Sequence, residues 1–230
     1  MTIRKILLFF GFLIIGTDYA FSQSVTAPNY ALKSHETLEI RKIETTDKAT
    51  LIYMDIENRI KGGSFCADNN IYIIYPNGKR NKLLFSSGIP VCPDSYKFKY
   101  PGEKLDFVLT FQPIPTGTEV ISLVEECSEN CFSFYGIILN RELNKKLDDA
   151  FILVDKGESD KALNSFIEIA EEITKKNMVV SDLLYLNIIK LSEETGNKAK
   201  ASEWYNRLKS SGTLLLQKYV EYLDEHVLNK

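Results

Sequence analysis

The pattern of hydrophobic and polar positions changes once along the chain, at about residue 140. Between Leu38 and Leu139, apolar and polar residues alternate in short runs separated by turn residues, which is typical of β-strands. After residue 140, apolar residues recur every three or four positions, as they do on one face of a helix. We therefore expect a multi-domain protein that is all-β over 23–140 and all-α over 141–230.

The first part predicts short strands joined by tight turns. In the clearest of them, Leu105, Phe107, Leu109 and Phe111 share one face. Elsewhere, Asn77-Gly78 is a strong signal for a hairpin turn. The predicted strands are 38–44, 50–58, 70–76, 80–86, 96–100, 105–111, 119–125 and 132–139. Many short strands with regularly spaced turns favour an antiparallel β-sandwich, with a barrel as the alternative.

This strand pattern resembles that of immunoglobulin-like domains, which implies two antiparallel sheets packed face to face. The resemblance is one of pattern alone. The Cys…Trp…Cys core arrangement is absent, because the single tryptophan, Trp204, lies in the second part of the chain. The predicted first domain is thus an immunoglobulin-like β-sandwich.

The second part predicts a series of helices with a repeated pattern. The predicted helices are 141–156, 158–176, 180–195, 198–210 and 213–228. Four residues recur at an offset of 39 positions: Gly157 as Gly196, Ala162 as Ala201, Phe166 as Tyr205, and Ile169 as Leu208. A glycine turn followed by a small residue and then an aromatic residue resembles the second helix of a tetratricopeptide repeat. The offset departs from the usual 34 residues of that repeat, and the aromatic and glycine positions of its first helix are largely missing.

The tetratricopeptide resemblance implies a binding groove. In that family the first helix of each pair lines the inner surface, which here places Phe151, Val154, Leu186 and Lys190 in a possible partner groove. Such a groove would hold an apolar segment of a protein partner, or pack against the β-domain. The last helix carries an apolar stripe that would cap the repeats. The short connection at Asn140 predicts that the two halves are packed together.

The first 22 residues predict a secretory signal peptide. Arg4 and Lys5 precede an apolar run over 6–16, and cleavage is expected after Ser22. The run is shorter than the roughly 17–25 residues of a membrane-spanning helix, although an uncleaved membrane anchor is the alternative. We expect an exported protein, periplasmic or at the cell surface, with no membrane span after cleavage.

Composition excludes several classes of protein. The 230 residues are 44% hydrophobic and 26% charged, which is ordinary for a globular chain. Removal of Arg4, Lys5 and Asp18 with the leader changes the formal net charge from -3 to -4. Because the charge is divided evenly between the halves, neither predicts a basic surface for nucleic acid.

The four cysteines all lie in the first part, and in an exported protein they predict disulfides. Among the possible pairings we favour Cys66–Cys92 and Cys127–Cys131. A metal site would need two close cysteine pairs or adjacent histidines. The spacing at 127–131 also differs from that of a redox Cys-x-x-Cys motif.

The sequence contains no recognised catalytic or cofactor motif, and we expect no cofactor, no metal site and no enzymatic activity. Of the two histidines, His35 lies in a poorly patterned segment and His226 in the last turns of the last predicted helix, where the helix dipole favours it, so we expect neither to be catalytic. Neighbouring carboxylates such as Glu125-Glu126 are interpreted as solvated surface.

These features together predict a non-enzymatic protein-interaction or assembly module of the bacterial cell envelope, with an unknown protein partner. The alternative is a carbohydrate-binding module whose aromatic residues stack on sugar rings. The candidate rings are Tyr72, Tyr75, Tyr96, Phe98 and Tyr100, although their alternation with polar neighbours is also typical of a sandwich core. An envelope hydrolase would need carboxylates that converge in a pocket.

Overall fold

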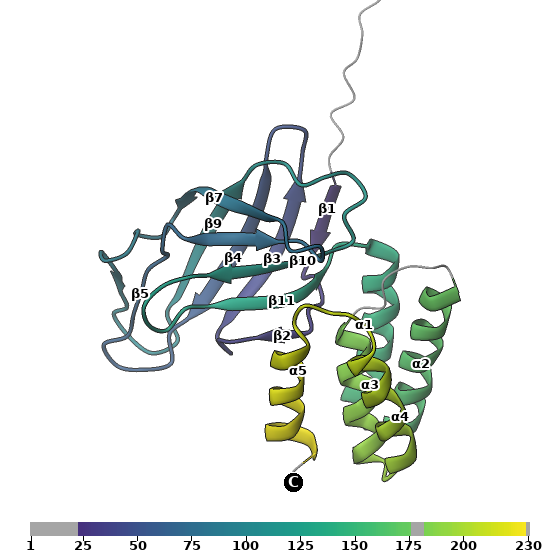
Figure 1. The fold of residues 1–230 in the computed structure, drawn as a ribbon. Coiled ribbons are helices and arrows are strands. Elements are labelled where there is room, and N and C mark those ends of the chain that lie inside the picture. Colours follow the sequence, from purple (N-terminus) through teal and green to yellow (C-terminus); the bar gives the residue numbers. More distant parts are fainter. Residues whose placement is uncertain (1–22, 176–181, 229–230) are drawn as a thin grey trace, which may run out of the picture.

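The computed structural model describes residues 23–175 and 182–228. Figure 1 shows a curled antiparallel sheet followed by a group of helices. The strands are β1 (Gln23–Thr26), β2 (Leu32–Lys33), β3 (Leu38–Thr45), β4 (Thr50–Glu57), β5 (Ser64–Phe65), β6 (Ile71–Ile74), β7 (Arg80–Ser87), β8 (Tyr96–Lys97), β9 (Lys104–Phe111), β10 (Val120–Glu125) and β11 (Ser133–Ile138). The helices are α1 (Arg141–Asp155), α2 (Ser159–Lys175), α3 (Asp182–Glu194), α4 (Lys198–Lys209) and α5 (Leu216–Leu223), and α5 continues into a π-helical turn over Asp224–Leu228. The predicted order of an all-β part and an all-α part is confirmed; the predicted signal peptide lies outside the described residues.

The main sheet curls because β7 belongs to two groups of strands. The sheet has nine strands in the order β1-β3-β4-β9-β7-β6-β10-β11-β2. The beginning of β7 pairs with β6, and its remainder, from Leu83, pairs with β9. A register shift between Leu83 and Phe85 marks an irregularity of the kind that bends a strand. The sheet therefore folds into two wings around one core.

The core between the wings follows the alternation of the sequence. On β9, Phe107, Leu109 and Phe111 are at most 2% exposed. On the facing wing, Ile73 and Leu123 are fully buried. Because burying an apolar side chain of this size contributes about 1.5–3 kcal/mol, this shared core is the main source of stability of the β part.

One predicted strand differs from the structure. In 96–100, only β8 forms, and it pairs with β5 outside the main sheet. Phe98 is buried, but Tyr100 is 59% exposed, since the chain turns at Pro101-Gly102 instead of continuing across the core. The strands β1, β2 and β5, which the alternation did not predict, are two to four residues long.

Asparagine and glycine mark several helix ends, whereas the last helix, predicted over 213–228, forms an α-helix only over Leu216–Leu223 and has no side-chain cap at its start. The side chain of Asn140 accepts a hydrogen bond from the Leu143 amide at 3.0 Å and so caps α1. Asn197 caps α4 in the same way through Lys200 at 3.2 Å. Gly157 follows α1 with a φ of +72°, a conformation that favours glycine.

The repeated positions of the helical half are mostly buried. Ala162 and Ala201 are at most 1% exposed, and Phe166 is fully buried. Tyr205 is only partly buried and has Lys209 over its ring. On α5, Tyr219 and Leu223 of the expected apolar stripe are fully buried.

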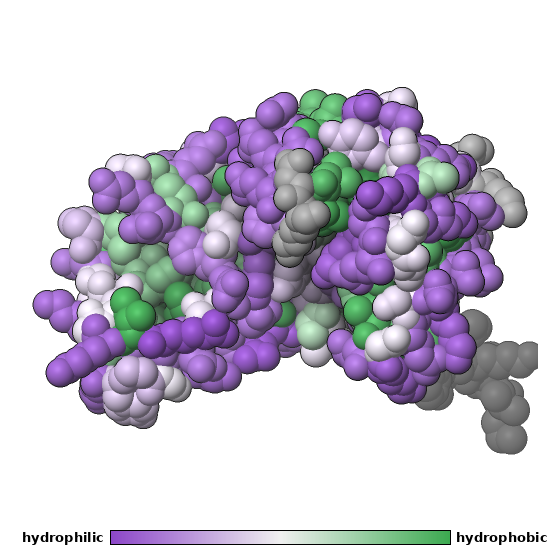
Figure 2. Space-filling view, turned by 90° about the horizontal axis from the view of Figure 1, so that it is seen from below, coloured by the Kyte–Doolittle hydropathy of each residue, from purple (hydrophilic) through white to green (hydrophobic). Residues whose placement is uncertain are grey.

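The two halves are in direct contact. Ile138 of β11 is part of the helical core. The side chain of Asn144, on α1, accepts a hydrogen bond from the Asn29 amide at 2.8 Å and donates one to the Ile138 carbonyl at 2.9 Å. Arg141 donates to the Ser24 carbonyl at 2.7 Å. The face seen in Figure 2 is largely hydrophilic over both halves, with separate apolar patches.

Two disulfides close loops of the β part. Cys66–Cys92 joins the segments next to β5 and β8, and Cys127–Cys131 closes the connection between β10 and β11. These are the pairings that the sequence favoured. Both bonds are consistent with an extracytoplasmic protein. Over the described ranges, no helix combines the length and the apolar character needed to cross a lipid bilayer.

Candidate functional site: a cleft between the sheet and the helices

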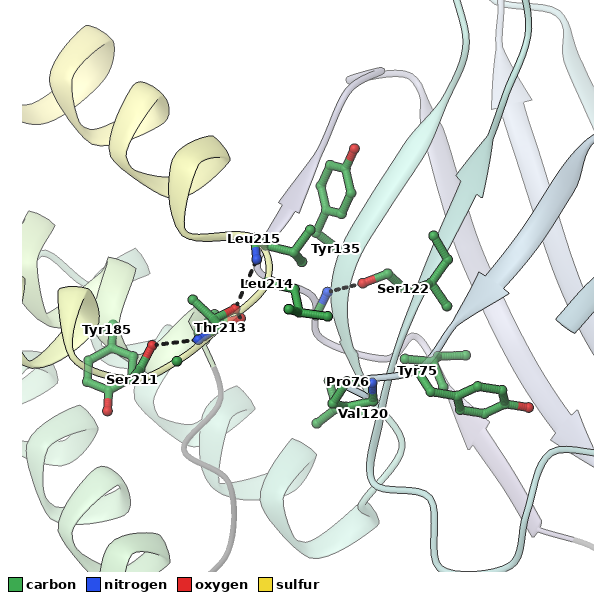
Figure 3. A pocket seen from close by; sticks show the side chains of 15 residues that line it. Tyr75, Pro76, Val120, Ser122, Tyr135, Tyr185, Ser211, Thr213, Leu214 and Leu215 are labelled. Carbon is green, nitrogen blue, oxygen red and sulfur yellow. Dashed lines mark hydrogen bonds between the residues drawn. The ribbon is translucent and has the colours of Figure 1, made fainter. Parts of the chain in front are cut away.

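A cavity of about 420 Å³ lies where the sheet meets the helical half. This interdomain cleft has one wall from the sheet, formed by the end of β6 with Tyr75 and Pro76 and by adjacent parts of β10 and β11. Its other wall comes from the start of α3 and the loop over 211–215. Figure 3 shows both walls. The volume is within the range of small-molecule and peptide sites, roughly 300–1,000 Å³.

The loop that forms the helical wall is shaped by its own hydroxyl groups. The Thr213 amide donates to Ser211 Oγ, and the Leu215 amide donates to Thr213 Oγ1, both at 3.3 Å. Such side-chain turns fix a short loop without regular structure. They leave Leu214 directed across the cleft and 71% exposed. Leu214 Cδ1 lies 3.5 Å from where a Cβ on Gly78 would be, so this side chain reaches the hairpin turn of the sheet.

The sheet wall depends on a glycine in β11. Gly136 has a φ of +65°, and its amide donates to Ser122 Oγ at 3.2 Å. A Cβ at this position would lie 3.1 Å from Ala31 Cβ and 3.6 Å from Tyr219 Oη. Only the Ala31 distance is shorter than ordinary packing, so the absence of a side chain lets the segment before β2 approach β11 closely.

Asp182 is the one charged residue among the described residues that line the cleft. Its carboxylate accepts a hydrogen bond from the Thr213 hydroxyl at 2.9 Å. Burial raises the pKa of Asp182, and the Thr213 hydrogen bond opposes this effect only in part. The buried Tyr219 hydroxyl faces the Asp182 carboxylate in a geometry that falls short of a standard hydrogen bond, and this interaction also opposes the raised pKa of Asp182. Burial, and then the nearby negative charge of Asp182, raise the pKa of Tyr219.

The groove residues predicted from the tetratricopeptide resemblance do not line this cleft. Leu186 is 4% exposed and belongs to the helical core. Phe151 packs edge-on against Phe166 with ring centroids 5.1 Å apart, and Val154 is partly buried against the same core. Lys190 is exposed, with its ammonium 3.9 Å from Glu194.

The aromatic residues considered for sugar binding do not form a row. Tyr72 is covered by the Arg80 guanidinium, 3.7 Å from its ring centroid. Tyr75 and Tyr96 pack against the sheet core, and Phe98 is buried. Tyr96 also donates a hydrogen bond to Glu103 at 2.6 Å. Of the five rings, only Tyr100 is largely exposed.

Glu125 is not the solvated surface residue that the sequence analysis expected. It is 6% exposed, and its two carboxylate oxygens accept hydrogen bonds from the amides of Asp68 at 2.7 Å and Phe132 at 3.1 Å. Burial raises the pKa of Glu125. The strand alternation would have predicted this burial, because Glu125 occupies the same face of β10 as the buried Ile121 and Leu123. This carboxylate ties the segment beside Cys66 to the start of β11.

Within the described ranges, no three His, Cys, Asp or Glu residues are grouped so that they could hold a metal ion. His35 is partly buried next to Ser34, and burial lowers the pKa of its imidazole. His226 stacks on Tyr222 at the C-terminal end of the helical half. Comparison with known proteins gave no match to a protein-family model, to a curated protein or to a solved structure.

Proposed function

We propose that this protein is an exported, non-enzymatic interaction module of the bacterial cell envelope, and that its interdomain cleft holds an apolar segment of a partner protein. The observation that carries this proposal is the cleft itself. Its lining is predominantly apolar, and it lies at the junction of two packed halves, which is a common place for a binding site. The exposed side chain of Leu214 offers a contact that a partner would bury.

We also propose that the β part is immunoglobulin-like and the helical part tetratricopeptide-like. Two wings around a single core support the first assignment. Equivalent burial of Ala162 and Ala201, each after a glycine turn, supports the second. Both folds commonly serve binding, and this support is by analogy because fold does not determine function.

The glycan-binding alternative has weaker support. A sugar ring stacks on an open aromatic face, whereas Tyr72 is covered by Arg80, and Tyr75 and Tyr96 pack against the core. A partner protein therefore fits the surface better than a glycan does.

Site-specific photocrosslinking in the native cell envelope tests the proposed partner site. A benzoyl-phenylalanine residue at position 214 would lie at the cleft, and the matched control at position 84 replaces Leu84, a 50% exposed residue of β7 outside the cleft lining. We expect a discrete crosslinked protein from position 214 that is absent from position 84. No crosslink at 214, or the same products from both positions, would contradict the proposal.

A further inference from the structure

The interdomain cleft combines apolar walls with a single carboxylate. Val120, Leu214 and Leu215 contribute apolar surface, and among the described lining residues only Asp182 carries a charge. Within the described part of the chain, no lysine, arginine or histidine forms an ion pair with Asp182. A carboxylate that is partly removed from water without a cation is unfavourable unless something compensates it. Its position at the start of α3 offers only the weak compensation of a helix dipole.

A second polar group at the same place is also incompletely satisfied. The Tyr219 hydroxyl is buried and makes no standard hydrogen bond to a described residue, although it faces the Asp182 carboxylate. It lies near two residues of the cleft lining, Gly136 and Asp182. Buried hydroxyl groups nearly always have a hydrogen-bond partner in folded proteins. Two incompletely satisfied groups therefore lie together, and the anionic one, Asp182, lines the apolar cavity.

We infer that the cleft takes a lysine side chain of the partner segment, with its ammonium group on Asp182 and apolar residues on either side. This inference rests on the proposed function and names the chemistry of the bound segment. The apolar walls suit the four-carbon stem of lysine, whose charged end then reaches the carboxylate.

The geometry of Asp182 favours lysine over arginine. One carboxylate oxygen, Oδ2, already accepts the Thr213 hydroxyl. Bidentate pairing with a guanidinium would use both oxygens of the carboxylate, whereas a compact ammonium needs only one. The remaining oxygen, Oδ1, is therefore the acceptor that we assign to the ligand.

A displayed library of random 12-residue peptides, panned on the full exported protein with its disulfides intact, tests this inference. We expect the selected peptides to carry a lysine flanked by apolar residues. Synthetic versions with norleucine in place of that lysine should bind about tenfold more weakly or worse, as expected for loss of a charge-assisted hydrogen bond. This comparison needs no variant of the protein.

Protein variants then assign the effect to the carboxylate. Asp182→Asn should weaken the lysine peptide about as much as the norleucine replacement does, and the two changes together should cost little more than either alone. Asp106→Asn, an exposed carboxylate on β9, is the matched control and should leave binding unchanged. Thermal unfolding of each variant checks that it is folded.

The outcomes separate this inference from the proposed function. If peptide binding is lost in Leu214→Asp but the peptides carry no lysine, select arginine instead, or are insensitive to Asp182→Asn, then the lysine assignment fails and the apolar cleft stands. If no peptide binds in a way that depends on Leu214, both proposals fail.

Discussion

Glu125 shows how a single buried carboxylate can join two segments of the β part. Each of its oxygens accepts a different backbone amide, from Asp68 and from Phe132. In Glu125→Gln, one acceptor becomes an NH₂ donor that faces an amide donor. Leaving a buried amide unsatisfied costs about 1–3 kcal/mol. We therefore expect the variant to unfold at lower denaturant concentration than the unmodified protein near pH 5.

This difference should depend on pH. Because burial raises the pKa of Glu125 above its ordinary value of 4.5, the stabilising contribution of its protonated form is fully present below pH 4.5 and is lost as the pH rises through the raised pKa. Glutamine does not titrate, so the difference in unfolding free energy should shrink between pH 4.5 and 8. Denaturant titrations across this range measure it, with Glu126→Gln, an exposed neighbour paired with Arg80, as the control. A difference that stays constant with pH would contradict the assignment.

Residues that depend on distant neighbours are the ones that the sequence does not predict. Asp182 shares the cleft lining with Val120 and Leu214, and these three residues come from separate elements or loops that only the fold brings together. No local pattern marks it as a binding residue. The alternation of β10, by contrast, already placed Glu125 on the buried face of the strand. The residue was expected at the surface because it is a carboxylate.

Among the elements, long and regular ones were predictable and short ones were not. Strands β4 and β9 each have eight residues, enough to display one buried face. The two-residue strands β2, β5 and β8 have too few positions to show a period, and their pairing is determined by partners elsewhere. The helical breaks at Gly157 and Gly196 were predictable because glycine favours the left-handed conformation that ends a helix.

Close approach between β11 and the segment before β2 gives a prediction at the scale of elements. Gly136→Ala would place a Cβ 3.1 Å from Ala31 Cβ, in a backbone conformation that favours glycine. We expect a loss of about 1–3 kcal/mol in unfolding free energy and faster hydrogen exchange of the Ala31 amide, which donates to the Tyr135 carbonyl at 2.8 Å. Gly117→Ala is the matched control, since its φ is +80° but no atom lies within 4 Å of the added Cβ. Equal losses in both variants would attribute the effect to backbone conformation alone.

At the scale of the whole molecule, a small polar network accompanies the apolar contact between the halves. Asn144 is 6% exposed and uses both ends of its amide. Its oxygen accepts from the Asn29 amide, while its nitrogen donates to the carbonyls of Ile138 and Asn140. Asn29 and Ile138 belong to the β part, and Asn140 caps α1. One side chain therefore fixes α1 against the β part, and the cleft between the halves depends on this arrangement.

Asn144→Ala should therefore weaken the coupling between the halves as well as the fold. The truncation leaves the Asn29 amide and the Ile138 carbonyl without this partner, which costs about 1–3 kcal/mol for each group that stays buried. We expect the variant to lose cooperativity, so that near-ultraviolet circular dichroism and the fluorescence of Trp204, which lies in the helical half, no longer report the same unfolding midpoint. Asn206→Ala, an exposed position on α4, should keep the two midpoints together. Coincident transitions in Asn144→Ala would mean that the apolar contact at Ile138 and Tyr219 is sufficient to make the halves unfold as one.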